Sequence, residues 1–133
     1  MSRGQGSGVK SNGYRDLQVW EKAMLLVEQV YALTASFPAD ERFGLTSQLR
    51  RAAVSVPSNI AEGYGRGGGE YRRFVDIAYG SLCEVETQLE LGSRLGFARP
   101  DSLTTARDLA SEVGRMLNGL RKHLTPDSLK LEP

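Results

Sequence analysis

Apolar residues recur at spacings of three and four along four segments of the chain, and this period restricts the fold more than any other feature of the sequence. Such spacing places side chains on one face of an α-helix, because successive residues are turned by about 100°. The first segment carries two registers side by side: Leu17, Trp20, Met24, Val27, Tyr31 and Thr34, and Val19, Ala23, Leu26, Val30 and Leu33. We therefore expect a helix with two packing partners, with Trp20 and Tyr31 as core or interface anchors.

The four segments predict helices over about 16–36, 42–63, 70–95 and 102–124. No alternating run rich in Val, Ile and Thr indicates a strand. Asp16 is the expected N-cap of the first helix, and Asp101 or Ser102 that of the fourth. Because the connections are short, we predict an all-α domain over 14–124, an antiparallel up-and-down four-helix bundle.

Proline and glycine modify the second predicted helix. Pro57 lies inside the apolar pattern and removes a backbone donor, so we expect a kink or a local break there. The glycine-rich run 63–69 predicts a flexible loop. Gly63, Gly65 and Gly68 match the G-x-G-x-x-G spacing of a nucleotide-binding loop, but such a loop follows a strand, and the preceding segment is predicted helical. We interpret the run as a connection between helices.

The ends of the chain lack the periodic pattern. Residues 1–13 are rich in glycine and serine, and residues 125–133 are bracketed by two prolines, so we predict disordered tails. No segment approaches the roughly 20 apolar residues that span a bilayer, and the first residues lack the apolar stretch of a secretory signal. With Cys83 as its only cysteine, the chain is predicted to be cytoplasmic and to have no membrane contact.

The cysteine and histidine content excludes several classes of function. Cys83 and His123 are the only residues of their kinds, which rules out a disulfide framework, a zinc finger and a Cys/His metal cluster. A di-iron centre in a bundle needs Glu-x-x-His motifs, and the residue three before His123 is Leu120. We find no nucleophile–base pair or paired-carboxylate site. We therefore predict a non-enzymatic protein with no catalytic residues, no metal and no cofactor.

Charge is unevenly distributed although its total is small. The chain has 17 Lys and Arg against 16 Asp and Glu, a formal net charge of +1. Residues 42–73 hold six arginines against two glutamates, which is +4, and residues 74–112 hold three arginines against seven acidic residues, which is −4. A guanidinium group suits bidentate contact with phosphate or carboxylate. The arginines therefore either bind a nucleic-acid backbone or pair with the acidic half of the same or a neighbouring subunit.

A second stripe on the second predicted helix consists of small hydroxyl and charged residues, Ser47, Arg51, Ser55, Ser58 and Glu62. Small side chains let another helix approach closely, and Arg51 and Glu62 could be ionic partners. Together with the wide apolar face of the first helix, this stripe indicates that the monomer has a further surface to bury. We predict a homo-oligomer.

Several runs of the chain resemble the bacterial four-helix-bundle family encoded in intervening sequences of 23S ribosomal RNA genes. They are 14–20 (YRDLQVW), Phe37-Pro38, 44–66 (GLTSQLRRAAVSVPSNIAEGYGR), Gly80-Ser81-Leu82 and Glu84. The resemblance implies an up-and-down bundle that assembles as a ring-shaped homopentamer. It also implies a distant similarity to accessory proteins of diversity-generating retroelements, which bind nucleic acid through a basic surface.

The resemblance supplies no catalytic residues. Asn59, Glu62, Gly63 and Arg66 match the family motif, which implies that they hold the end of the second helix and the subunit contact. The predicted motif and oligomer-contact set is Ser47, Arg51, Ser55, Asn59, Glu62, Gly63 and Arg66.

Two hypotheses on function follow. In the first, a cytoplasmic homopentamer binds RNA or a nucleoprotein through Arg50, Arg51, Arg66, Arg72 and Arg73. In the second, the protein is an interaction scaffold or accessory subunit with no direct nucleic-acid contact, and its arginines close subunit interfaces.

Overall fold

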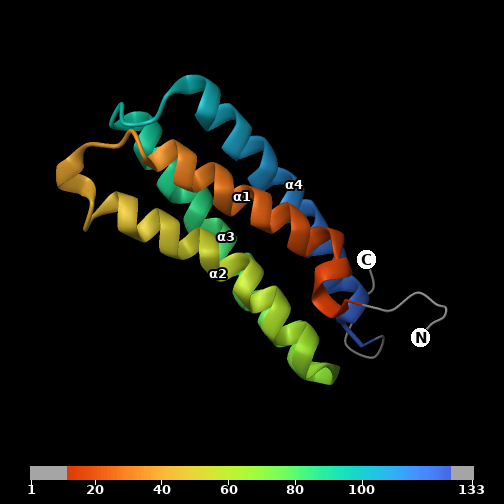
Figure 1. Ribbon diagram of the computed structural model, residues 1–133. Helices are drawn as coiled ribbons and strands as arrows, with labels where there is room; N and C mark the ends of the chain where they lie inside the picture. The colour runs from red at the N-terminus through yellow and green to blue at the C-terminus, as the bar shows by residue number, and fades with distance from the viewer. Residues whose placement is uncertain (1–11, 127–133) are drawn as a thin grey trace.

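The computed structural model describes residues 12–126, and within them every element is helical (Figure 1). The four long helices are α1 (Gln18–Thr34), α2 (Leu45–Arg66), α3 (Gly68–Arg94) and α4 (Pro100–Leu124). Two short 3-10 helices, η1 (Gly13–Asp16) and η2 (Ala39–Glu41), precede α1 and α2. The predicted four-helix bundle is therefore confirmed. The predicted tails fall mostly on 1–11 and 127–133, which lie outside the described residues.

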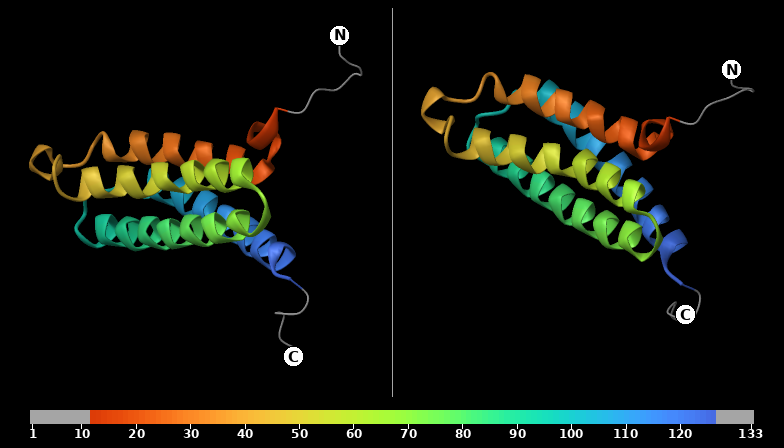
Figure 2. Two further views of the ribbon diagram at one scale, coloured as in Figure 1. Left: turned by 90° about the horizontal axis from the view of Figure 1, so that it is seen from below. Right: turned by 60° about the horizontal axis from the view of Figure 1, so that its bottom comes forward.

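Each helix packs beside its neighbours in the chain, and α4 returns to α1 to close the bundle (Figures 1 and 2). The contact between α2 and α3 is the most extensive of the four. No helix within 12–126 is long and apolar enough to cross a membrane.

One of the two apolar registers of α1 is buried in the core of the bundle. Val19, Ala23, Leu26, Val30 and Leu33 are buried, and they face buried residues of the other helices, such as Leu49, Val56, Leu82, Val113 and Leu117. Of the other register Thr34 is also buried, and the remaining residues are partly exposed. Because α1 contacts both α2 and α4, the expectation of two packing partners holds, and part of its wide apolar face is still uncovered.

The connection between α2 and α3 differs from the predicted loop. The helix α2 continues to Arg66 and α3 begins at Gly68, so Gly67 alone joins them. Its φ of 71° and the φ of 55° at Gly68 both lie in the left-handed region that favours glycine, and these two residues together allow the chain to reverse. The prediction of a flexible loop over 63–69 was wrong, because most of these glycines are accommodated inside helices.

Close packing explains why one of these glycines lies in a helix. A Cβ atom on Gly63 would come within 2.6 Å of the Cβ atom of Phe74 and 3.2 Å of the carbonyl oxygen of Tyr71. The missing side chain therefore lets the end of α2 approach the start of α3.

Two helix starts differ from expectation, and of the two outcomes expected at Pro57, a kink or a local break, the structure excludes the break. Asp16 does not cap α1, because it ends η1 and its carboxylate accepts a hydrogen bond from the Asn12 backbone N–H at 2.9 Å. The helix α4 begins earlier than predicted, with Pro100 in its first turn. No break occurs at Pro57, since α2 is continuous through it. The ribbon of α2 curves along its length in Figure 1.

Candidate interaction surfaces

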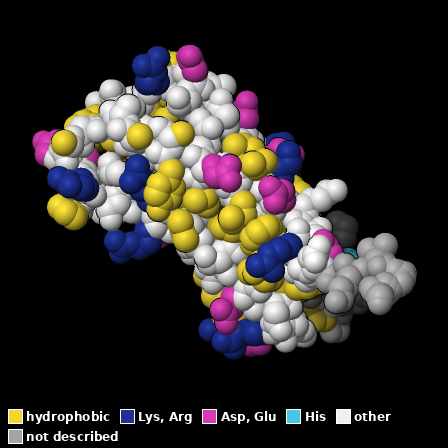
Figure 3. Space-filling model, in the orientation of Figure 1, with side chains coloured by type: hydrophobic (Ala, Val, Ile, Leu, Met, Phe, Trp, Pro, Cys, Tyr) yellow, Lys and Arg dark blue, Asp and Glu magenta, His cyan; other side chains and the backbone are white. Residues whose placement is uncertain are grey.

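An apolar groove runs between α1 and α2 on the outside of the bundle. Its hollow of about 370 Å³ is lined by residues of η1, α1 and α2: Tyr14, Trp20, Met24, Val27, Val54, Pro57, Ser58 and Ala61. Figure 3 shows hydrophobic side chains gathered along the middle of this side of the molecule. The groove is made by the register of α1 that the core leaves uncovered.

The apolar surface continues toward the connection between α1 and α2. A second hollow of about 430 Å³ lies there, lined by Tyr31, Arg42, Phe43, Thr46, Ser47, Arg50, Arg51 and Val54. Phe43 is 89% exposed, and Tyr31 and Val54 are 44% and 39% exposed. We call this surface the α1–α2 face and define it by Trp20, Met24, Val27, Tyr31, Phe43 and Val54. An almost fully exposed phenylalanine beside further apolar side chains is typical of an interface.

Arg50 is held by groups at the end of α1. Its Nε donates to the Thr34 hydroxyl at 2.8 Å, and an Nη donates to the Tyr31 carbonyl oxygen at 3.4 Å. Its guanidinium also lies over the Tyr31 ring, 4.5 Å from the centroid. Thr34 is buried, and its hydroxyl donates a hydrogen bond to the Val30 carbonyl oxygen at 2.7 Å. Arg50 therefore ties α2 to α1.

Arg51 and Arg42 are exposed beside the α1–α2 face. Arg51 donates to the Ser47 hydroxyl at 3.2 Å, and the Arg42 guanidinium lies 5.4 Å from the centroid of the Phe43 ring. Neither arginine forms an ion pair with a residue in the described part of the chain. Their charges remain available to a partner.

The other three predicted arginines are paired with carboxylates of the same chain. Arg66 lies 2.8 Å from Glu62, and Arg73 lies 3.0 Å from Glu70. Arg72 pairs with Asp76 at 3.2 Å and donates to the Thr125 hydroxyl.

The five predicted nucleic-acid ligands therefore do not form one site. Arg50 and Arg66 are 16 positions apart on the same helix, which separates their Cα atoms by about 24 Å along the axis. Arg50 and Arg51 lie near the start of α2, whereas Arg66, Arg72 and Arg73 lie around its junction with α3.

The predicted contact stripe of α2 lies partly against α3 in the same chain. The hydroxyl groups of Ser55 and Ser81 are 2.8 Å apart. Asn59 donates to the Ser55 carbonyl at 2.8 Å and to its hydroxyl at 2.9 Å. Gly63 admits Phe74, as described above. Ser55 and Gly63 therefore take part in the α2–α3 contact inside the monomer and Asn59 bonds Ser55 within α2, while Ser47 lies with Arg51 beside the α1–α2 face.

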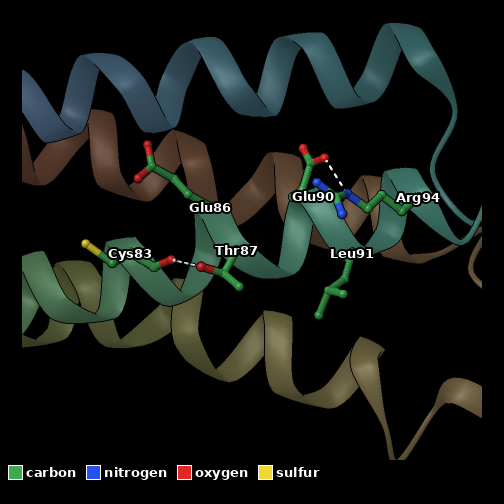
Figure 4. A pocket seen from close by; sticks show the side chains of 6 residues that line it. All are labelled: Cys83, Glu86, Thr87, Glu90, Leu91 and Arg94. Carbon is green, nitrogen blue, oxygen red and sulfur yellow. Dashed lines mark hydrogen bonds and ion pairs between the residues drawn. The ribbon is translucent and has the colours of Figure 1, made fainter.

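A third hollow, of about 510 Å³, lies along the outer side of α3 (Figure 4). All its lining residues belong to this helix: Cys83, Glu86, Thr87, Glu90, Leu91 and Arg94. Leu91 projects toward the side where α2 runs, and Glu86 and Glu90 project toward the side of α4. Because no other element contributes to the lining, the hollow is an open surface of the helix.

The pKa values of the two carboxylates of this surface are shifted in opposite directions. Burial raises the pKa of Glu86 above its ordinary value. The hydrogen bond from Arg94, with the nearby charge of Arg107, lowers the pKa of Glu90. The Thr87 hydroxyl donates to the Cys83 carbonyl at 2.9 Å, and no imidazole lines the surface beside the thiol. Within residues 12–126 no group of three or more His, Cys, Asp or Glu side chains is placed to hold a metal ion.

The fold and these surfaces can be compared with known proteins. The profile of the family described as 23S rRNA-intervening sequence protein matches residues 15–119. The chain belongs to this family. The match spans all of α1, α2 and α3 and most of α4, and therefore includes the α1–α2 face.

A solved structure shares the fold of this member of the 23S rRNA-intervening sequence protein family. It is the crystal structure of a protein with unknown function from the S23 ribosomal protein family of Bacteroides thetaiotaomicron. The TM-score is 0.70 at 19% sequence identity, and the alignment covers 78% of this chain and 98% of the other. A search of curated proteins finds no match. Neither the family nor the solved neighbour indicates an enzyme.

Sequence reasoning missed two members of the α1–α2 face. Phe43 lies in the connection before α2, outside every periodic pattern, and Val54 lies off the apolar stripe of α2. The signal that could have found Phe43 is an aromatic residue next to an arginine in a connection with no apolar neighbours to bury it. Tyr31 and Trp20 were predicted as core or interface anchors, and both contribute to this face.

Proposed function

We propose that this protein is a non-enzymatic self-assembling module in which the α1–α2 face is buried between copies. The observation that carries the proposal is the exposure of Phe43, beside Tyr31, Val54 and an apolar groove. Removing apolar surface from water is favourable by about 25 cal/mol per Å². A cytoplasmic location is part of the proposal, since Cys83 is the only cysteine in the chain.

A homopentameric ring is the assembly that the family resemblance favours. A closed ring with an odd number of subunits needs two different faces on each copy, because a contact that uses the same face twice ends at a dimer. The near-neutral total charge, made of a +4 and a −4 segment, suits an assembly that brings opposite charges together.

Two matched variants test the assembly. Val54→Asp places a charge on the α1–α2 face, and Leu25→Asp places the same charge on a residue of α1 that is equally exposed, at 37%, but lines neither hollow of that face. We expect Val54→Asp to sediment as a folded monomer, with unchanged helical circular dichroism, and Leu25→Asp to keep the oligomer. Equal masses for the two variants would contradict the proposal.

RNA binding is the second candidate, favoured by Arg42 and Arg51, which have no carboxylate partner among residues 12–126. It predicts filter retention of a structured RNA that weakens at higher salt and is lost in an Arg42→Ala, Arg51→Ala double variant. Arg115→Ala is the control, because Arg115 is also exposed and donates to a serine hydroxyl, with no ion pair within the described part of the chain, but lies on α4. Absence of retention at low salt would rule this candidate out.

A further inference from the structure

A second exposed apolar stripe follows the outer side of α3. Ile77, Leu91 and Leu95 are 41%, 44% and 58% exposed. Ile77, Glu84 and Leu91 are spaced by seven residues, which places them on one face of the helix with Leu95 one turn further. We call this surface the α3 face and define it by Ile77, Glu84, Leu91 and Leu95.

Glu84 is the charged group of the α3 face. It is exposed and forms no ion pair with any residue between 12 and 126. The glutamate further along α3, Glu90, is already paired with Arg94 and Arg107. The α3 face therefore combines apolar side chains with an unpaired anion, whereas the α1–α2 face combines apolar side chains with the unpaired cations Arg42 and Arg51.

Arg51 and Glu84, one charged group from each face, lie at the same height along the bundle. Arg51 and Glu84 line one hollow between α2 and α3, together with Gln48, Ala52, Ser55 and Gln88. The 2.8 Å contact between Ser55 and Ser81 holds this level of α2 against this level of α3. Rotation about an axis parallel to the helices moves a copy sideways without changing height. Such a rotation would bring Arg51 of one copy to the level of Glu84 of the next.

We propose that copies of this chain assemble head to tail, with the α1–α2 face of one copy on the α3 face of the next. The contact joins apolar surface to apolar surface and places Arg51 beside Glu84. In such an assembly one face of each kind stays free at the two ends of an open chain of copies. The chain of copies closes into a ring when the rotations between successive copies add up to a full turn. This inference rests on the proposed self-assembly and adds the identity of the second face.

Single variants on each face, and their mixture, test the proposal. Val54→Asp disables the α1–α2 face, and Leu91→Asp disables the α3 face. In a head-to-tail assembly each variant alone is monomeric. An equimolar mixture forms a heterodimer with twice the mass of the chain and nothing larger, because only one intact pair of faces remains. Circular dichroism and thermal unfolding verify that both variants fold.

A charge exchange tests the same contact without relying on Leu91. Arg51→Glu and Glu84→Arg should each reduce the oligomer in sedimentation, and the double variant that carries both changes should recover it, since every contact then holds an exchanged pair. The rescue should weaken at high salt.

The outcomes separate this inference from the proposed function. If Leu91→Asp assembles like the unmodified chain while Val54→Asp is monomeric, the α1–α2 face pairs with itself, so the head-to-tail contact is wrong and self-assembly stands. If the unmodified chain is a monomer, both are wrong. A mixture of the two monomeric variants that forms no heterodimer also overturns the head-to-tail contact.

Discussion

Arg50 and Arg51 are adjacent in the chain but have different surroundings. Arg50 lies against the end of α1, where it bonds Thr34 and the Tyr31 carbonyl and stacks on the Tyr31 ring. Arg51 is exposed and donates a hydrogen bond to the Ser47 hydroxyl one turn away. Their neighbouring positions predicted a shared role in binding, and only the folded helix shows that one side chain belongs to an intrachain contact.

We therefore expect Arg50→Ala to lower the free energy of unfolding by about 1–2 kcal/mol, because it removes a charged hydrogen bond and a cation–π contact. Arg51→Ala should change it by less than about 0.5 kcal/mol, as is usual for an exposed side chain. Urea unfolding followed by circular dichroism, at a concentration where both variants are monomeric, measures the difference. If both variants lost the same free energy of unfolding, the hydrogen bonds and the ring contact of Arg50 would not be what stabilises the fold.

Gly63 provides a second prediction at this scale. Gly63→Ala should lower the free energy of unfolding by about 1–3 kcal/mol, because its Cβ would collide with Phe74 and the Tyr71 backbone. Gly65→Ala is the matched control in the same helix, since a Cβ there meets nothing within 4 Å. It should be neutral or stabilising by up to about 1 kcal/mol. Chemical denaturation of both variants checks the sign, and a neutral Gly63→Ala would contradict the close approach of α2 and α3.

At the scale of the elements, apolar periodicity predicted the number, order and packing of the helices because it reports which face of each is buried. It failed at the α2–α3 junction. The glycines there lower helix propensity, yet Gly63 is required by packing against Phe74, and of the run 63–69 only Gly67 and Gly68 have the positive φ that reverses the chain between two helices. Tertiary contact outweighed local propensity.

The same error concealed the pairing of the arginines. Glu62 and Arg66 are four residues apart, a spacing that pairs side chains on a helix, but the predicted helix ended at 63. Arg72 and Asp76 pair across the boundary between the basic and the acidic segment. Counting charge by segment therefore overstated how much of the basic charge is available to a ligand.

Two glutamates of α3, Glu86 and Glu90, should contribute to stability with opposite dependence on pH, because their pKa values are shifted in opposite directions. The pKa of Glu90 is lowered, so its contribution to stability is present above the ordinary value of 4.5 and is lost as pH falls through the lowered value. The pKa of Glu86 is raised, so its contribution is present below 4.5 and is lost as pH rises through the raised value. Glu86→Gln should therefore raise the thermal midpoint at pH 7, and Glu90→Gln should lower it.

Carboxyl NMR titration of the unmodified chain measures both directions at once. The Glu86 resonance should titrate above pH 4.5 and the Glu90 resonance below it. The stability difference of each glutamine variant should vanish in acid, where both carboxyls are protonated in the unmodified chain. If the two glutamates titrated with the same midpoint, the effects assigned to burial at Glu86 and to Arg94 at Glu90 would be wrong.

At the scale of the whole molecule, the wide apolar face of α1 and the opposed charges of the two segments predicted a further surface to bury. They could not place it, because its position depends on which register of α1 the core takes. The core takes the register of Val19, Leu26 and Val30 and leaves the register of Trp20 and Tyr31 beside Val54. Phe43, in the connection, extends that surface beyond the helices.

Sedimentation equilibrium of the unmodified chain, over a concentration range that includes the micromolar, tests self-assembly most directly. We predict a single species with five times the 14.6 kDa mass of the chain, which dissociates when Val54 is replaced by aspartate. A monodisperse 14.6 kDa species at micromolar concentration would contradict it, and the exposed Phe43 and its neighbours would then require a different partner.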